Sequence, residues 1–149
     1  MPILDASVPD RLLWPEDAPW PRRRIRRLIG RFHACFPEIS YETRIRLPVA
    51  NAQAVRSAGN STVLVYGGLL RHRLVGSAGL SVALAHETGH HLGGEPRMKF
   101  LRWLSSEERA DEWARDVGLP AVYATRASAV WRRGRRELDG VARSLFLRL

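Results

Sequence analysis

One stretch of the chain decides how the rest is organised: Gly79-Leu80-Ser81-Val82-Ala83-Leu84-Ala85-His86-Glu87-Thr88-Gly89-His90-His91-Leu92-Gly93-Gly94. Its first half is almost wholly apolar and its end carries two glycines, which predicts a buried helix with a stop near Gly93. Four residues advance a helix by slightly more than one turn, so His86 and His90 should project from one face, about 6 Å apart. Gly89 costs such a helix about 1 kcal/mol relative to alanine, which indicates that another element packs close to that turn.

The residues from His86 to His90 have the H-E-x-x-H spacing of zinc-dependent hydrolases. Two imidazoles at this separation can both reach one zinc ion at about 2.0–2.1 Å. Glu87 lies one residue round from His86, where it is better placed to take a proton from a zinc-bound water than to ligate the metal. The alternative is a buried helix whose histidines are satisfied by hydrogen bonds. The apolar residues before His86 and the glycines after it favour the zinc site.

Length and composition favour a single globular domain, residues 1–149. A chain that is 45% hydrophobic and 26% charged can bury one core of ordinary size. No apolar run is long enough to cross a bilayer, and the N-terminus lacks the features of a secretory signal. The single cysteine, Cys35, excludes an internal disulfide, fits a reducing compartment and should be buried on the apolar side of a helix. We therefore expect a cytoplasmic monomer without a transmembrane segment.

The net charge of +9 comes almost wholly from arginine, since Lys99 is the only lysine. Such a surface attracts nucleic acid by long-range electrostatics. The arginines are spread over many segments rather than gathered in one platform, which favours the simpler interpretation of arginine as the solvating residue of this chain. Non-specific nucleic-acid binding through the arginine-rich surface is therefore kept as a secondary expectation.

Changes of period along the chain predict an α+β fold. Residues 1–19 hold four prolines and no sustained period, which is typical of an extended N-terminal arm, here attached through Trp14 and Trp20. An amphipathic helix should run from Pro21 to Phe36 and end before Pro37. A period of two and a turn at Gly59-Asn60 predict a small, mostly antiparallel three-stranded sheet, with strands at Ile39–Leu47, Ala52–Ala58 and Ser61–Tyr66.

Further helices are expected after the histidine helix. Ser105 as N-cap and Glu108 at the capping-box position predict a helix start, and Gly118 followed by Pro120 predicts its end. Residues 135–149 carry an apolar stripe at helical spacing that is more typical of a core helix than of a partner surface. The other expected elements are a short helix at Leu69–Leu74, a loop or short helix at Arg97–Leu104 and a helix at Pro120–Arg133.

Two histidines leave a catalytic zinc short of its usual three protein ligands. No histidine follows His91, so the missing ligand should be a carboxylate. The helix predicted near Ser105 supplies carboxylates about twenty residues after His90 in the sequence, an interval that suits a turn and a second helix packed against the first. The four carboxylates are Glu107, Glu108, Asp111 and Glu112.

At these residues the sequence resembles a known group of enzymes. The segments His86-Glu87-Thr88-Gly89-His90 and Glu107-Glu108-Arg109-Ala110-Asp111-Glu112-Trp113-Ala114 are similar to the H-E-x-x-H and E-x-x-A-D-x-x-A pair of gluzincins, above all to the HtpX, CAAX-prenyl-protease and OMA-type metalloendopeptidases. The similarity covers roughly residues 50–115. It implies a zincin-like fold, in which the small sheet packs against the active-site helix and a glutamate-bearing helix, with additional N- and C-terminal helices.

The resemblance also implies roles for individual residues. His86, His90 and Glu107 would be zinc ligands, Glu87 the general base, and Asp111 a group that orients a ligand histidine. Helical geometry agrees, because Glu107 and Asp111 share one face of the predicted helix with two alanines. The candidates for stabilising an oxyanion are Tyr123, His72 and Arg126; nothing in the sequence chooses among them, and Tyr123 is as readily a core aromatic.

The function expected from the resemblance is a soluble zinc endopeptidase that hydrolyses a protein or peptide substrate. Strand Thr62–Tyr66 could pair with an extended substrate by strand addition. The chain lacks the transmembrane segments of those relatives, so lipid-modified substrates do not carry over. ImmA-type peptidases, which act on repressors, share a similar motif pair and remain an alternative, whereas SprT-type DNA-associated proteases would be expected to use a third histidine. Another alternative is a basic nucleic-acid-associated protein with a non-catalytic zinc site.

Overall fold

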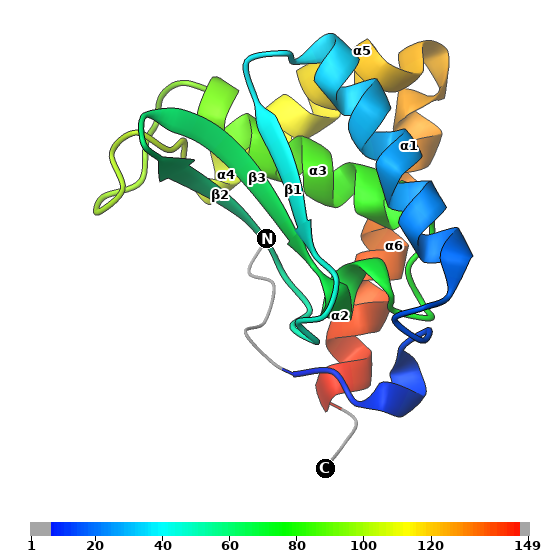
Figure 1. Ribbon diagram of the computed structural model, residues 1–149. Helices are drawn as coiled ribbons and strands as arrows, with labels where there is room; N and C mark the ends of the chain where they lie inside the picture. Colours follow the sequence, from blue (N-terminus) through cyan, green and yellow to red (C-terminus); the bar gives the residue numbers. More distant parts are fainter. Residues whose placement is uncertain (1–6, 147–149) are drawn as a thin grey trace.

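The histidine helix lies at the centre of the fold. In the computed structural model, which describes residues 7–146, this helix is α3 (Ser77–Leu92). Its residues from Gly79 to His90 are all buried, as the apolar first half predicts. The sheet and the helices α1 (Pro19–Cys35), α4 (Glu107–Trp113) and α6 (Ala127–Phe146) all pack against α3 (Figure 1).

The sheet has three strands, as expected, but it is mixed rather than mostly antiparallel. Its order is β1 (Ser40–Arg44), β3 (Asn60–Tyr66), β2 (Ala52–Ser57), with β1 parallel and β2 antiparallel to β3. The connection over residues 45–51 passes the end of β3 and brings the chain back on its far side. Since β3 has a partner on both edges, the expectation that it adds a substrate strand is wrong; β1 and β2 are the edge strands.

The hairpin turn lies one residue earlier than expected. Ser57 pairs with Asn60, so the two turn residues are Ala58 and Gly59, with φ angles of 49° and 82°. A tight two-residue turn of this kind needs positive φ at both positions, and glycine fits the second. The strands therefore pair one residue earlier than predicted, which puts Gly59 at the second turn position rather than at the first.

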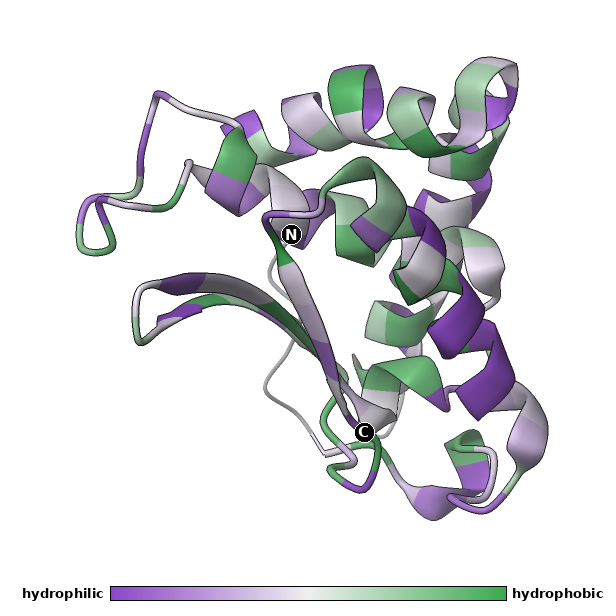
Figure 2. Ribbon diagram, turned by 45° about the horizontal axis from the view of Figure 1, so that its top comes forward, coloured by the Kyte–Doolittle hydropathy of each residue, from purple (hydrophilic) through white to green (hydrophobic). Residues whose placement is uncertain are grey.

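Helix α1 is amphipathic, with Ile25, Leu28 and Phe32 buried and arginines on its outer side (Figure 2). It ends at Cys35, in agreement with the stop predicted from Pro37. Cys35 is exposed, which corrects the expectation of a buried cysteine. Phe36, one residue further round, takes the buried position instead.

The first helix after α3 differs from its prediction at both ends. Ser106, not Ser105, is the N-cap of α4, because its Oγ accepts the backbone N–H of Arg109 at 3.2 Å. Gly118 does not end the helix: α4 passes through a π-helical segment, η2 (Ala114–Gly118), into α5 (Leu119–Tyr123). Pro120 is tolerated because it lies in the first turn of α5.

The chain breaks instead at Ala124, where φ is 51°, and continues through a short 3-10 turn, η3 (Ala124–Arg126), into α6. Helix α6 is one continuous element, not two helices that meet near Gly134. A Cβ at Gly134 would collide with Val82 and Ala78 of α3, so this glycine permits a close helix crossing. Leu138 and Val141 of the expected stripe are buried in the core.

Short segments complete the description. A turn of 3-10 helix, η1 (Asp10–Leu12), precedes α1, and α2 (Gly67–Leu70) begins two residues before the expected short helix. The rings of Trp14 and Trp20 meet in a T-shaped arrangement, with centroids 5.1 Å apart, and Leu13 is buried. Residues 1–6 of the expected arm and 147–149 of the last expected helix lie outside the described residues. Among the helices of residues 7–146, none combines the length and apolar character that spanning a bilayer requires.

Candidate metal centre

Helix α3 presents two histidines to the same point. The rings of His86 and His90 lie with centroids 4.7 Å apart and nearly perpendicular planes. Both side chains are almost completely buried, with 1% and 4% of the residue exposed. This arrangement follows from the four-residue spacing on a helix that is buried on all sides.

Glu107, the first residue of α4, meets both histidines. Its two carboxylate oxygens lie 3.0 Å from His86 Nε2 and 3.2 Å from His90 Nε2. One ligand atom from each of the three side chains can be chosen so that all lie within 4.8 Å of one another. The three residues could therefore hold a metal ion. We call this group the His-His-Glu cluster.

The close approach of α4 depends on the glycine inside α3. A Cβ at Gly89 would lie 2.8 Å from the carbonyl oxygen of Ala110 and 3.1 Å from the Trp113 ring. The side chain of Ala110 is a single methyl group, which also allows the two helices to lie close together. The expectation that an element packs against Gly89 is therefore confirmed, and that element is the helix that carries Glu107.

The other ring nitrogen of each histidine is held by a separate group. His86 Nδ1 lies 2.7 Å from Asp111 Oδ1, and His90 Nδ1 lies 2.7 Å from the backbone oxygen of Ser105. Each Nδ1 can donate its proton there, so that the Nε2 atom of each ring faces Glu107 and the cluster. Arg135 of α6 donates to the second oxygen of Asp111 at 3.3 Å.

Sequence reasoning did not identify Ser105 and Arg135 as parts of this arrangement. Ser105 acts through its backbone carbonyl, which any residue type possesses. Its position is fixed because its N–H donates to the His90 carbonyl at 2.7 Å and its hydroxyl donates to the Gly94 carbonyl at 2.6 Å. Arg135 lies on a helix far along the chain, one arginine among many, so no spacing signals its role.

The cluster is electrostatically poised to hold a positive charge between its members. Burial lowers the pKa of His86, but hydrogen bonds to Asp111 and Glu107 outweigh it and raise the pKa to about 9. Hydrogen bonds from His86 and His90 hold the pKa of Glu107 well below its usual range. The acidic groups thus favour a cation at the position where the three ligand atoms converge.

Glu87 lies beside the cluster but not in it. Its side chain is buried, and one carboxylate oxygen lies 4.0 Å from His86 Nε2. Burial raises the pKa of Glu87, while the neighbouring histidines oppose that rise. A carboxylate whose proton affinity is raised and which faces a cation site has the properties of a general base.

The structure does not bring the three oxyanion candidates to the cluster. The hydroxyl of Tyr123 bonds to Ser81, which precedes His86 by five residues, or about 7.5 Å along the axis of α3. His72 is fully buried, and its ring contacts the N–H of Leu74 and the hydroxyl of Ser144. Arg126 lies over the Tyr123 ring, with 5.8 Å between its guanidinium carbon and the ring centroid.

His91, next to the cluster in sequence, has a different neighbour. Its Nε2 lies 2.9 Å from the Thr62 carbonyl and can donate to it, so His91 joins the end of α3 to the central strand β3.

Comparisons of the chain with protein-family models, with curated proteins and with solved structures find no match.

Proposed function

We propose that this chain is a zinc-dependent endopeptidase of zincin-like architecture. In this proposal His86, His90 and Glu107 hold the zinc ion, Glu87 is the general base and Asp111 orients His86. One observation carries it: a cluster of two nitrogens and a carboxylate lies next to a buried carboxylate that is not needed as a ligand.

The ligand set supports zinc and a catalytic use of it. Two histidines and one glutamate are a donor set that zinc accepts, and three protein ligands leave a position for water. Structural zinc sites normally close with four protein ligands, whereas the cluster found among residues 7–146 has three. The alternative of a non-catalytic zinc site also leaves the burial of Glu87 without a purpose.

The chemistry divides between the ion and the protein. Bound zinc would lower the pKa of a water molecule and polarise the carbonyl of the scissile peptide bond. Glu87 would be the residue that accepts a proton from that water and hands it to the leaving amine. Asp111 and the Ser105 carbonyl hold the two imidazoles by their Nδ1 protons, so that both Nε2 atoms keep their direction through the cycle.

An extended peptide could reach this site along β2. Among the described strands β2 pairs only with β3, and it packs against α3. A strand with one free edge can add a peptide through main-chain hydrogen bonds, which selects an extended backbone rather than particular side chains. This proposal replaces β3, which has no free edge, as the strand that binds substrate.

The test combines metal analysis with cleavage of a peptide library. We expect the purified protein to hold one zinc ion per chain and to cleave peptides until a chelator is added. Glu87→Gln should retain the metal and lower cleavage by at least about a hundredfold, because it removes the base and not a ligand. Glu108→Gln, an exposed carboxylate on α4, is the matched control and should leave both unchanged.

Two results would overturn the proposal. Full peptidase activity of Glu87→Gln would remove the general base from the mechanism. Zinc binding with no cleavage of any library peptide by the wild-type protein would favour the non-catalytic site.

A further inference from the structure

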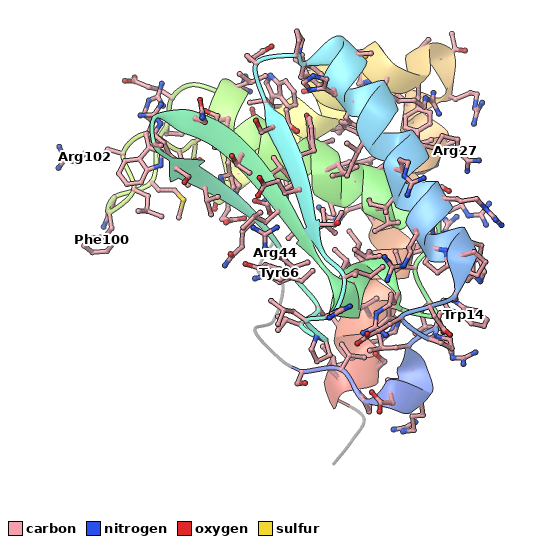
Figure 3. The ribbon with its side chains drawn as sticks, in the orientation of Figure 1. Trp14, Arg27, Arg44, Tyr66, Phe100 and Arg102 are labelled. Atoms are coloured by element: carbon pink, nitrogen blue, oxygen red, sulfur yellow. The ribbon has the colours of Figure 1, made fainter. Side chains whose placement is uncertain are left out.

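The loop between α3 and α4 carries an unusual group of exposed side chains. We call residues 95–104 the apolar loop. Three of its large hydrophobic side chains are exposed: Phe100 to 93% and Leu101 and Trp103 each to 40%. Figure 3 shows Phe100 and Arg102 at the far end of this loop, pointing away from the body of the protein.

The loop is held in this form by hydrogen bonds across its neck. The N–H of Met98 donates to the Leu104 carbonyl at 2.9 Å, and Arg97 Nη1 donates to the Trp103 carbonyl at 3.1 Å. Leu104 itself is buried and donates its N–H to Leu101, which closes a turn at the tip. The apolar tip is therefore presented by a defined backbone, so the loop should lose little conformational entropy when it binds a partner.

Cationic side chains alternate with the apolar ones. Arg97, Lys99 and Arg102 are exposed, and the loop contains one acidic residue, Glu95. The whole chain adds a net charge of +9. Aromatic and leucine side chains flanked by arginine and lysine are typical of segments that lie in the boundary of an anionic bilayer.

We propose that the apolar loop docks the protein on an anionic lipid surface. Phe100, Leu101 and Trp103 enter the boundary between headgroups and acyl chains, while the three cations contact lipid phosphates. The projecting Phe100 side chain suits this partner, because it points away from the body of the protein and lipid headgroups part around such a side chain, whereas a protein partner must supply a matching pocket. The long stems of arginine and lysine keep their charges at the headgroup level when the tip is immersed.

Docking through this loop would hold the His-His-Glu cluster close to the lipid surface. The neck of the loop leads to Ser105, whose carbonyl oxygen lies 2.7 Å from His90 Nδ1. The proposal does not depend on the proposed peptidase activity, because lipid binding can be measured without metal or substrate.

Vesicle sedimentation tests the proposal. We expect the protein to bind phosphatidylcholine vesicles that contain phosphatidylglycerol at least about tenfold more tightly than vesicles of phosphatidylcholine alone. Phe100→Ser combined with Leu101→Ser should weaken binding to the anionic vesicles by about tenfold or more. Leu47→Ser combined with Leu74→Ser is the matched control, since these leucines are 47% and 48% exposed elsewhere on the surface, and it should bind like the wild-type protein.

A second readout separates insertion from mere attraction of charges. Trp103 should contribute a blue shift of tryptophan emission on binding, and that shift should be lost in Trp103→Phe. Equal binding by the wild-type protein and the Phe100→Ser/Leu101→Ser variant would overturn the proposal, because it would leave only the general positive charge. Absence of binding to the anionic vesicles would also overturn it and would point to a protein partner.

Discussion

In each histidine of the His-His-Glu cluster, Nδ1 is hydrogen-bonded to a group outside the cluster and Nε2 faces Glu107. His86 is held by the side chain of Asp111 and His90 by the carbonyl of Ser105. The two carboxylates therefore have different tasks, although both lie on one face of α4. Glu107 contacts both histidines through Nε2, and Asp111 contacts one through Nδ1.

This difference predicts two grades of metal loss. In the proposed zinc site Glu107→Ala would remove a ligand, so zinc affinity measured by competition with a chromophoric chelator should fall by more than about a hundredfold. Asp111→Ala removes only the orienting group, and the fall should be about ten- to a hundredfold. Glu108→Ala is the control on the same helix. A larger loss for Asp111→Ala than for Glu107→Ala would exchange the two roles.

A second residue, His72, predicts how stability depends on pH. His72 is fully buried, and burial lowers its pKa to about 4. The unfolded chain takes up a proton near pH 6.5, whereas the folded protein does not until about pH 4. The stability linked to His72 is therefore complete above pH 6.5 and is lost as the pH falls toward 4, by up to about 3 kcal/mol.

Urea denaturation of the wild-type protein and His72→Gln between about pH 7 and pH 4.5 measures this contribution. The variant should lose less free energy of unfolding over that interval, because its side chain does not titrate. Parallel pH profiles for the two proteins would contradict the assignment of the acid sensitivity to His72.

At the scale of elements, the contact between α3 and α4 depends on one missing side chain. A Cβ at Gly89 would meet the backbone of Ala110 and the ring of Trp113, and backbone cannot move aside cheaply. Gly89→Ala should therefore separate the helices and lower the free energy of unfolding by about 1–3 kcal/mol. At the proposed zinc site it should also weaken metal binding, because Glu107 would be displaced.

Gly30→Ala is the matched control for that substitution. Gly30 is exposed in α1, and a Cβ there would have nothing within 4 Å. Alanine favours a helix over glycine, so this variant should gain up to about 1 kcal/mol in thermal or urea unfolding. If both glycine variants changed stability in the same direction, the close contact at Gly89 would not be the cause.

Another inter-element contact stabilises the start of α3. Its N-cap, Gly76, has no side chain that could cap the helix. Glu137 of α6 caps it instead, because one of its carboxylate oxygens accepts hydrogen bonds from the N–H groups of Gly76 and Gly79, each at 2.8 Å. Glu137→Ala should lower the free energy of unfolding by about 1–2 kcal/mol. The exposed Asp139→Ala, on the same helix, serves as control in urea denaturation. A Glu137→Ala variant as stable as the wild-type protein would show that the cap contributes nothing.

These contacts show where reasoning from sequence succeeds and where it stops. The alternation of side chains located the first strand, the turn residues near Gly59 located the other two, and the apolar run before His86 located α3, because burial and turn geometry act locally. The expectation of a mostly antiparallel sheet was wrong, since no local pattern states which strand lies in the middle and therefore which pairs are parallel. The cap that Glu137 supplies to α3 and the ion pair of Arg135 with Asp111 join residues that only the packing of α6 brings together.

On the scale of the whole molecule, the dominant property is the net charge of +9. Exposed arginines line the outer side of α1, among them Arg23 and Arg27, and others lie on α6. They are not arranged with exposed aromatic rings of α1 on which bases could stack. The charge therefore favours attraction to the phosphate backbone of nucleic acid without recognition of bases.

Any binding to duplex DNA should consequently be weak, independent of sequence and steeply dependent on salt. If four phosphates are neutralised, affinity should fall about a hundredfold between about 50 and about 200 mM salt. Arg23→Gln combined with Arg27→Gln should reduce the slope of log affinity against log salt. Fluorescence anisotropy with two unrelated duplexes measures both effects. Sequence-selective binding that survives physiological salt would contradict this prediction and support a regulatory role.

The strand order also governs when the molecule can assemble during synthesis. β3 is the middle strand of the sheet but the last of the three to leave the ribosome, so β1 and β2 have no described strand to pair with until Tyr66 has emerged. The β1–β3 pair is parallel and joins residues 22 positions apart, a pairing less local than the β2–β3 hairpin, so we expect it to form after the hairpin. A nascent chain halted before β3 would expose two unpaired strands to its neighbours, and chaperones would be expected to retain it until α3, which begins at Ser77, follows and covers the sheet.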